Sequence, residues 1–153
     1  MAKIGSHPSY GYSFVEQISS ASSLGSGDSG KLFMVDQSSA FTINLPKLST
    51  SIAGWQAKFV IQTADSNDVH IMAYGLTSSG GTGDSGATND GDTVIYKEMA
   101  TTDAGAATAT SQDGVILKSG ATVGDSISIF TDGSSWYATS SVADAAHGDD
   151  IDG

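Results

Sequence analysis

The stretch SISIFTDGSSWYA, residues 126–138, decides the fold class of this chain. Apolar and polar residues alternate before Asp132-Gly133, a dipeptide typical of a two-residue hairpin turn. Such a turn places Ile129 opposite Trp136 on one face of the hairpin and leaves Phe130 on the opposite face. The stretch therefore predicts two antiparallel strands that carry apolar side chains on both faces.

The same β signals continue outward from this hairpin. Short apolar or alternating runs, separated by turn-forming residues, predict further strands at residues 31–36, 40–45, 56–62, 69–74, 93–96 and 115–117. The segments 75–91 and 100–113 consist mainly of small and polar residues and are expected to be exposed loops. The pattern indicates an all-β fold, which we expect to be a single antiparallel β-sandwich or a jelly-roll-like domain.

The length of 153 residues suits one ordinary domain. We expect an extended N-terminal arm over residues 1–30, a β domain over residues 31–142 and an acidic C-terminal tail over residues 143–153. The segment FVEQISS inside the arm could form a short helix or a strand. Because an isolated Gly/Ser-rich arm would be disordered, we expect it to lie on its own domain or on a neighbouring subunit.

Several predicted strands carry apolar or aromatic side chains on both faces. In residues 69–74, Val69 and Ile71 point to one face, and Met72 and Tyr74 point to the other. An antiparallel sheet with one wet face shows a clean alternation of apolar and polar residues instead. Both faces are therefore expected to be covered, by a second sheet or by another copy of the chain.

The composition excludes several classes of function. The chain has no cysteine, which excludes disulfides and thiolate metal sites. It has 17 acidic and six basic residues, all six of them lysines, and a formal net charge of −11. Because attraction to phosphates dominates nucleic-acid affinity, we expect no nucleic-acid partner. No apolar run is long enough to span a membrane, and the first residues lack the apolar segment of a secretory signal, so we expect no membrane association.

Two motifs suggest an enzyme, and both fail on their context. Residues 24–33, LGSGDSGKLF, match most of the phosphate-loop spacing. A phosphate loop, however, needs a helix after its lysine, whereas Lys31 opens a predicted strand and Asp28 would place a negative charge in the cradle. The tetrapeptide GDSG occurs twice, and the three histidines (His7, His70 and His147) have no spacing that predicts a triad or a metal site. We therefore expect no enzymatic activity.

Acidic residues concentrate in one loop (Asp84, Asp90, Asp92) and in the tail (Asp144, Asp149, Asp150, Asp152). Calcium prefers such oxygen ligands, but the EF-hand spacing is absent, and acidic residues are also common in turns for backbone reasons. We expect no cofactor, and calcium is the one alternative that this pattern leaves open.

An ordered series of short elements resembles a β domain that recurs in virion proteins of tailed phages. The matching pieces are Ala40–Pro46, Ala53–Trp55, Phe59–Ile61, Ser66–Ile71, Gly91–Val94, Gly124–Ile127 and Asp132–Tyr137. The resemblance covers about residues 30–140. Such domains occur in head decoration proteins, head fibres and tail fibres, and the resemblance implies a non-enzymatic structural role, commonly as a homotrimer.

The resemblance leaves two virion roles open. The first is a capsid decoration, or cement, protein that stabilises the phage head on its outer capsid surface, with the major capsid protein as partner. The second is a tail or head fibre module that binds host-surface glycans. A separate chain with its own Met1 favours decoration, and we find no shaft repeat. A third interpretation, from another class, is a free carbohydrate-binding β-sandwich in which Trp55, Trp136 and Tyr137 stack on sugars, although we expect Trp136 to be in the core.

The candidate site is accordingly a set of interface residues. They are aromatic or apolar residues of the arm and of the second strand faces, together with one strand histidine. The candidates are Tyr10, Tyr12, Phe14, His70, Met72, Tyr74 and Tyr137.

Overall fold

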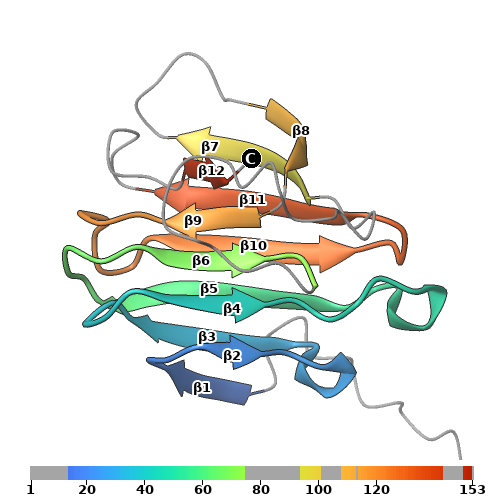
Figure 1. Cartoon of the computed structure of the whole chain (residues 1–153), viewed down its shortest axis with the longest axis horizontal. Coiled ribbons are helices and arrows are strands. Elements are labelled where there is room, and N and C mark those ends of the chain that lie inside the picture. Colours follow the sequence, from blue (N-terminus) through green and yellow to red (C-terminus); the bar gives the residue numbers. More distant parts are fainter. Residues whose placement is uncertain (1–13, 75–93, 101–107, 113, 143–149, 153) are drawn as a thin grey trace, which may run out of the picture.

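The computed structural model describes residues 14–74, 94–100, 108–112, 114–142 and 150–152 of the chain. They form two sheets, neither of which closes on itself (Figure 1). The seven-stranded sheet contains, in spatial order, β1 (Phe14–Ile18), β3 (Lys31–Asp36), β5 (Gln56–Thr63), β10 (Ser126–Thr131), β11 (Trp136–Val142), β7 (Val94–Ala100) and β8 (Thr108–Gln112). The five-stranded sheet contains β12 (Asp150–Asp152), β9 (Gly114–Leu117), β6 (Val69–Met72), β4 (Phe41–Asn44) and β2 (Ser22–Ser23). The all-β prediction is confirmed.

The first six strands form a winding that alternates between the two sheets. The odd strands β1, β3 and β5 are parallel neighbours in the seven-stranded sheet. The even strands β2, β4 and β6 are parallel neighbours in the five-stranded sheet. Each odd-numbered strand and the even-numbered strand that follows it thus form one coil. The three coils lie side by side, from blue to green in Figure 1. We call residues 14–72 the winding.

The prediction of an antiparallel domain is wrong, because both sheets are mixed. Alternation of apolar and polar residues records which face a side chain occupies, and it is the same for parallel and antiparallel neighbours. Parallel strands need long crossover connections. In the winding each crossover contains a strand of the other sheet, so strands that follow each other in the chain do not pair there.

The remaining strands complete the sheets mainly by antiparallel pairing. In the seven-stranded sheet, β10 pairs with β5 and β11 pairs with β10, both antiparallel, and β7 then pairs with β11 in parallel. In the five-stranded sheet, β9 pairs antiparallel with β6. Strand β8 lies in a segment that we expected to be a loop, β12 lies in the expected tail, and β1 and β2 lie in the expected arm. Residues from position 14 onward of that arm therefore take part in the two sheets.

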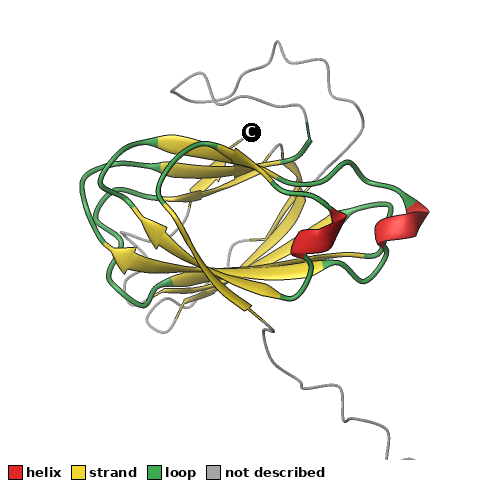
Figure 2. Ribbon diagram, turned by 90° about the horizontal axis from the view of Figure 1, so that it is seen from below, coloured by secondary structure: helices red, strands yellow, loops and turns green. Residues whose placement is uncertain are grey.

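One core lies between the two layers seen in Figure 2. Strands of both sheets contribute fully buried residues to it, for example Phe59 and Ile71. Within the winding, the rings of Phe33 and Phe59 stack with centroids 5.1 Å apart. Burying a side chain of this size stabilises the fold by about 1.5–3 kcal/mol. No described residue belongs to a helix long and apolar enough to cross a membrane.

The hairpin of the opening stretch forms, but with a different register. Thr131 pairs with Trp136 and Ile129 with Ala138, so the loop contains the four residues Asp132–Ser135 rather than two. Thr131 causes the difference, because its Oγ1 accepts a hydrogen bond from the Gly133 N–H at 2.8 Å and donates one to the Ser135 carbonyl at 2.7 Å. The shift of two positions keeps every side chain on its predicted face.

Candidate interaction surface

The side of the seven-stranded sheet that points away from the core carries three rows of register partners. The rows are Val15, Leu32, Lys58, Ser128 and Thr139; Gln17, Met34, Val60, Ser126 and Ser141; and Gln56, Phe130 and Tyr137. We call these three rows the outer face. On the five strands from β1 to β11 these rows include one lysine and no carboxylate, although the chain has 17 acidic residues. The outer face is therefore nearly neutral on a strongly acidic protein.

The outer face is apolar in two places. At its edge, Val15 is 67% exposed, and the neighbouring side chains of Leu32 and Met34 are partly buried. Near the hairpin loop, Phe130 is 47% exposed and stacks on Tyr137, with ring centroids 5.1 Å apart and an interplanar angle of 16°. Because the two rings stack, each of them covers one face of the other.

Asp132 holds this aromatic pair in place by accepting a hydrogen bond from Tyr137. The Tyr137 hydroxyl donates to Asp132 Oδ2 at 3.1 Å, and the backbone N–H groups of Ser134 and Ser135 donate to Asp132 Oδ1 at 2.8 and 2.9 Å. These backbone hydrogen bonds hold the pKa of the Asp132 carboxyl below its ordinary value. The hydrogen bond to Asp132, together with its charge, raises the pKa of Tyr137. The pair is thus held in one arrangement while it remains at the surface.

The predicted interface residues fall into several environments. Tyr10 and Tyr12 lie outside the described residues. Phe14 is 69% exposed on the edge strand β1, and Tyr137 is partly buried on the outer face. Within this set, the structure therefore brings only Tyr137 into the rows defined above.

The three candidates around β6 belong to the other sheet. Met72 is only 4% exposed, so this side chain is part of the interior. His70 is partly buried in β6, and Tyr74 is 45% exposed with the Lys47 ammonium 5.6 Å from its ring centroid. This cation–π contact occupies part of the Tyr74 ring. Sequence reasoning missed Leu32, Met34 and Val60, although their alternation within strands 31–36 and 56–62 was a usable signal.

In the loop that resembles a phosphate loop, the carboxylate of Asp28 occupies the position that a bound anion would take. Asp28 ends a short 3-10 turn, η1 (Ser26–Asp28), and its Oδ2 accepts a hydrogen bond from the Gly25 N–H at 2.7 Å. The Lys31 ammonium lies 2.7 Å from Asp28 Oδ1 and 2.6 Å from Glu16 Oε2. The next residues form strand β3, as predicted. An anion at this loop would have to displace Asp28.

These contacts shift both ionisable groups toward their charged forms. Partial burial alone would raise the pKa of Asp28, but the hydrogen bonds from Gly25 and Lys31 leave it below its ordinary value. Hydrogen bonds to Asp28 and Glu16 raise the pKa of Lys31. Lys31 therefore joins β1 to the η1 turn by two ion pairs.

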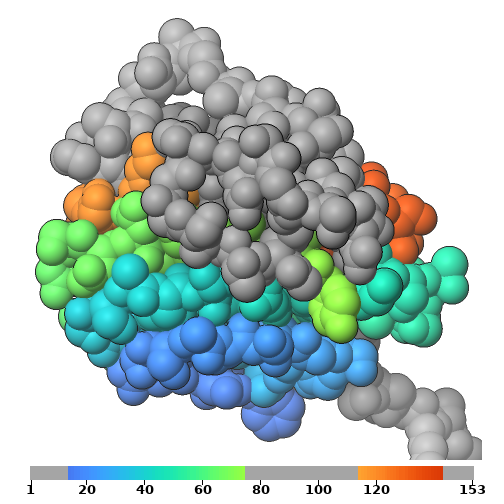
Figure 3. All heavy atoms as spheres, in the orientation of Figure 1, coloured from blue at the N-terminus to red at the C-terminus, as the bar shows by residue number. Residues whose placement is uncertain are grey.

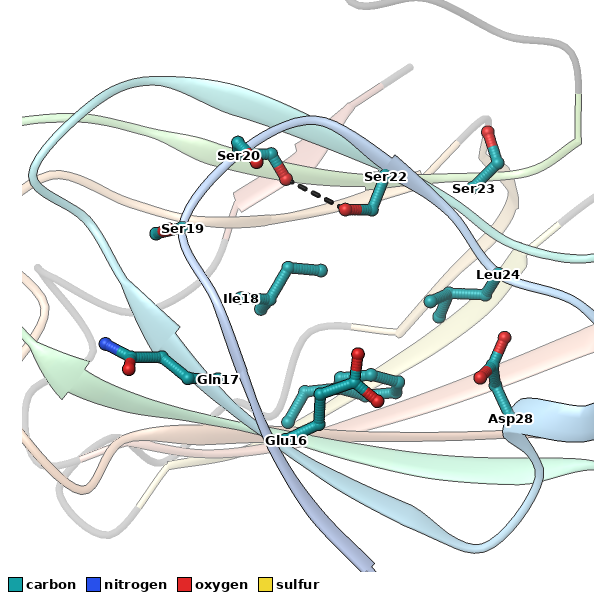
Figure 4. A pocket seen from close by; sticks show the side chains of 10 residues that line it. Glu16, Gln17, Ile18, Ser19, Ser20, Ser22, Ser23, Leu24 and Asp28 are labelled. Atoms are coloured by element: carbon teal, nitrogen blue, oxygen red, sulfur yellow. Dashed lines mark hydrogen bonds between the residues drawn. The ribbon is translucent and has the colours of Figure 1, made fainter.

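A pocket opens at the end of the winding, between its first coil and the η1 turn (Figure 4). Its volume is about 440 Å³. Its lining is mostly polar, with Ile18 and Leu24 as its aliphatic residues, and the carboxylates of Glu16 and Asp28 point into the space (Figure 4). Figure 3 shows the first coil, in blue, along one end of the molecule. The pocket exists because β1 and β2 are the last strands of their sheets on this side.

The histidines and acidic residues that could form a metal or catalytic centre lie only partly within the described residues. Among the residues that the structure describes, no three His, Asp or Glu side chains lie close enough to hold a metal ion. His7, His147 and the acidic residues proposed for calcium in the loop lie outside the described residues, as do Asp144 and Asp149. Asp150 and Asp152 belong to β12.

Trp55 and Trp136 are core residues. They are 3% and 0% exposed, and their rings meet edge to face with centroids 5.2 Å apart. The expectation for Trp136 is confirmed, and Trp55 is equally unable to stack on a sugar. Comparisons of the chain with known protein families, with curated proteins and with solved structures give no match.

Proposed function

We propose that this protein is a non-enzymatic structural subunit that associates with copies of itself through the outer face. The observation that carries the proposal is the charge distribution. A chain with a formal net charge of −11 has, across five neighbouring strands, three rows of side chains that contain no carboxylate. The centres of protein interfaces are depleted in charged residues in the same way.

Electrostatics favours this face over others for contact between copies. Two acidic copies repel each other, but at physiological salt this repulsion is screened beyond about 8 Å. At contact distance the cost of burying charges decides, since each unpaired buried charge costs several kcal/mol. Within the three rows Lys58 is the only charged residue, and Asp36 on β3 and Lys97, the register partner of Thr139 on β7, lie at their margins. Contact of the outer face with another copy therefore carries a small desolvation cost.

The Phe130–Tyr137 pair supplies an ordered apolar contact on this face. Interface hot spots are commonly aromatic, and binding costs less when a side chain is already fixed in one rotamer. Stacking fixes Phe130, and Asp132 fixes Tyr137. Because the rings stack on each other, one face of each ring is already covered and cannot stack on a sugar.

The specific role that we propose is a capsid decoration protein that binds the major capsid protein on the outer surface of a phage head as a homotrimer. Its support is the ordered series of elements in residues 40–137 that resembles virion β domains, together with the outer face. We further propose that the two mixed sheets constitute a β-sandwich, since strands of both contribute to one core. The core positions of Trp55 and Trp136 favour decoration over a glycan-binding fibre module.

Self-association is tested by native mass spectrometry of the wild-type protein and of two variants. We expect a trimer for the wild type at micromolar concentration, and a monomer for Phe130→Glu, which places a charge in the contact. Val123→Glu is the matched control, because Val123 is a 62% exposed apolar residue outside the outer face. A wild-type protein that is monomeric at this concentration, or equal effects of both variants, would contradict the proposal.

The decoration role requires a separate experiment. Purified protein is mixed with phage capsids from which decoration subunits have been removed, and bound protein is quantified after sedimentation. Stoichiometric binding that Phe130→Glu reduces and Val123→Glu preserves is the expected result. A trimer that ignores capsids but adheres to host cells would support the fibre module instead.

A further inference from the structure

Lys58 occupies the centre of the outer face in both directions. Its strand, β5, is the middle one of the five strands that carry the three rows (Figure 1). Its row is also the middle one, because Gln56 and Val60, its neighbours on the same side of β5, belong to the other two rows. The one charge of the outer face therefore lies where protein interfaces are most depleted in charged residues.

Within its own copy Lys58 has no counterion among the residues that the structure describes. Its register partners Leu32 and Ser128 are uncharged, and none of the ion pairs and side-chain hydrogen bonds between described residues includes Lys58. The carboxylate at the margin of this face belongs to Asp36, four residues along β3 from Leu32, which corresponds to about 13 Å. Asp36 Oδ1 accepts a hydrogen bond from the Ser38 N–H at 3.0 Å. The partly buried Lys58 is thus neutralised only by solvent.

This position makes the outer face a poor partner for itself. A two-fold contact brings the same surface of both copies together, so a contact centred on the outer face would place the two Lys58 side chains against each other. Neither copy could offer a carboxylate from its three rows. Two ammonium groups would then lose their hydration without gaining a counterion, which is costly.

We infer that the outer face binds a different surface of the neighbouring copy, and that a carboxylate of that second surface forms an ion pair with Lys58. The inference rests on the proposed self-association and adds the chemistry of its second surface. A copy of the chain suits this role, because its 17 acidic residues all lie outside the three rows. Contacts between two different surfaces close into a ring when they repeat, as a cyclic trimer requires. Lys58 then determines how the copies meet.

The variant Lys58→Met tests the inference by the sign of its effect on association. If Lys58 pairs with a carboxylate, its loss leaves that carboxylate buried and unpaired, and the dissociation constant should rise at least about tenfold. If the outer face meets itself, the same change removes two unpaired charges and should lower the dissociation constant. Native mass spectrometry of a dilution series measures it. An unchanged or lower dissociation constant would overturn the inference.

Two further lysine variants serve as controls. Lys58→Arg keeps the positive charge and should retain the oligomer of the wild type. Lys47→Met removes the same formal charge from an exposed lysine in the loop after β4, which belongs to the other sheet, and should leave association unchanged. Equal losses for Lys58→Met and Lys47→Met would assign the effect to net charge and contradict the ion pair.

Cross-linking of the wild-type protein locates the second surface and does not depend on how any variant folds. A carbodiimide joins a lysine amine to a carboxylate in contact with it, and mixing isotopically labelled with unlabelled copies identifies the cross-links between copies. We expect Lys58 to be joined to an Asp or Glu outside the three rows and their margins, and we expect Lys58→Arg to lose this product.

The outcomes separate this inference from the proposed function. An oligomer in which Lys58 gives no cross-link between copies, or a dimer in which it is joined to Asp36 at the margin of the outer face, would overturn the inference and leave self-association intact. A wild-type protein that is monomeric at micromolar concentration would contradict the proposed function and this inference together.

Discussion

The winding and the hairpin region both pack strands around the same core, but they differ in the relative direction of neighbouring strands. In the winding, residues 14–72, every neighbouring pair within a sheet is parallel and each connection crosses to the other sheet. In the hairpin region, residues 114–142, β9 and β10 pair antiparallel with the last coil, and β10 and β11 are joined by a short loop. Both regions nevertheless place their largest apolar side chains in one common core.

This difference shows which residues determine how the strands pair in each region. The hairpin is specified locally, because Thr131, Asp132 and Gly133 form the loop that sets its register. The winding is specified by packing between distant residues, such as the stacked rings of Phe33 and Phe59, which are register partners on adjacent strands. A contact of this kind becomes favourable only after the intervening chain has been ordered.

The largest expected effect concerns the contact that joins the two regions. Trp136 of the hairpin is fully buried and meets Trp55, which precedes β5 of the winding. We predict that Trp136→Ala lowers the free energy of unfolding by about 3–5 kcal/mol, because it leaves a large cavity between the regions. Urea denaturation followed by circular dichroism measures this change.

The matched variant for this prediction lies on the same hairpin but on the opposite face. Phe130→Ala removes an exposed ring that contacts Tyr137, and the expected loss is about 0.5–1.5 kcal/mol. Similar losses for the two variants would mean that the hairpin is not held to the winding through its buried face.

The second prediction concerns the point where the hairpin loop touches the winding. Gly133 has φ +94°, and a Cβ added there would lie 3.0 Å from the Ser49 carbonyl oxygen and 3.2 Å from Thr50 Cα. We predict that Gly133→Ala lowers the free energy of unfolding by about 2–3 kcal/mol, through backbone strain and this contact together.

Gly124 isolates the strain component of that loss. Its φ is +100°, but a Cβ there would meet no atom within 4 Å. Gly124→Ala should therefore cost only about 1–2 kcal/mol. If both glycine variants lose the same stability, then the hairpin loop does not press against the segment around Ser49.

The sequence predicted the face of each strand residue better than the order of the strands. Alternation located eight of the strands, because an inward-facing residue such as Val35 or Ile43 must be apolar whatever its neighbour is. It could not reveal the winding, since parallel and antiparallel neighbours impose the same alternation. Strand β1 was ambiguous because four of its five residues are exposed, and only Ile18 is anchored in the core.

The candidate surface could be predicted only in part for the same reason. Tyr137 was identified from the hairpin, where the opposing strand is adjacent in sequence. Leu32, Met34 and Val60 form one surface with it only because β3, β5 and β10 are neighbours in the sheet. Met72 has the same alternating pattern, and yet it is buried. Which second faces remain exposed is decided by the tertiary fold, and single strands do not encode it.

The smallest expected effect is a pH dependence confined to the hairpin. Because hydrogen bonds lower the pKa of Asp132 in the folded protein, its contribution to stability is present above its unfolded pKa, about 3.9, and is lost as the pH falls through the folded value. Tyr137 has a raised pKa, so its contribution is present below about 10 and is lost as the pH rises through the folded value. The hairpin should therefore weaken at both extremes of pH.

Two variants separate these contributions in denaturation curves recorded as a function of pH. Asp132→Asn should flatten the wild-type dependence on both sides, because its carboxylate takes part in both shifts. Tyr137→Phe should flatten only the alkaline side, since the backbone N–H groups of Ser134 and Ser135 still bind Asp132. An Asp132→Asn variant whose pH dependence equals that of the wild type would show that the ordered loop owes nothing to this carboxylate. The locally specified hairpin would then depend on Thr131 and Gly133 alone, and its stability, like that of the winding, would come from the core rather than from its turn.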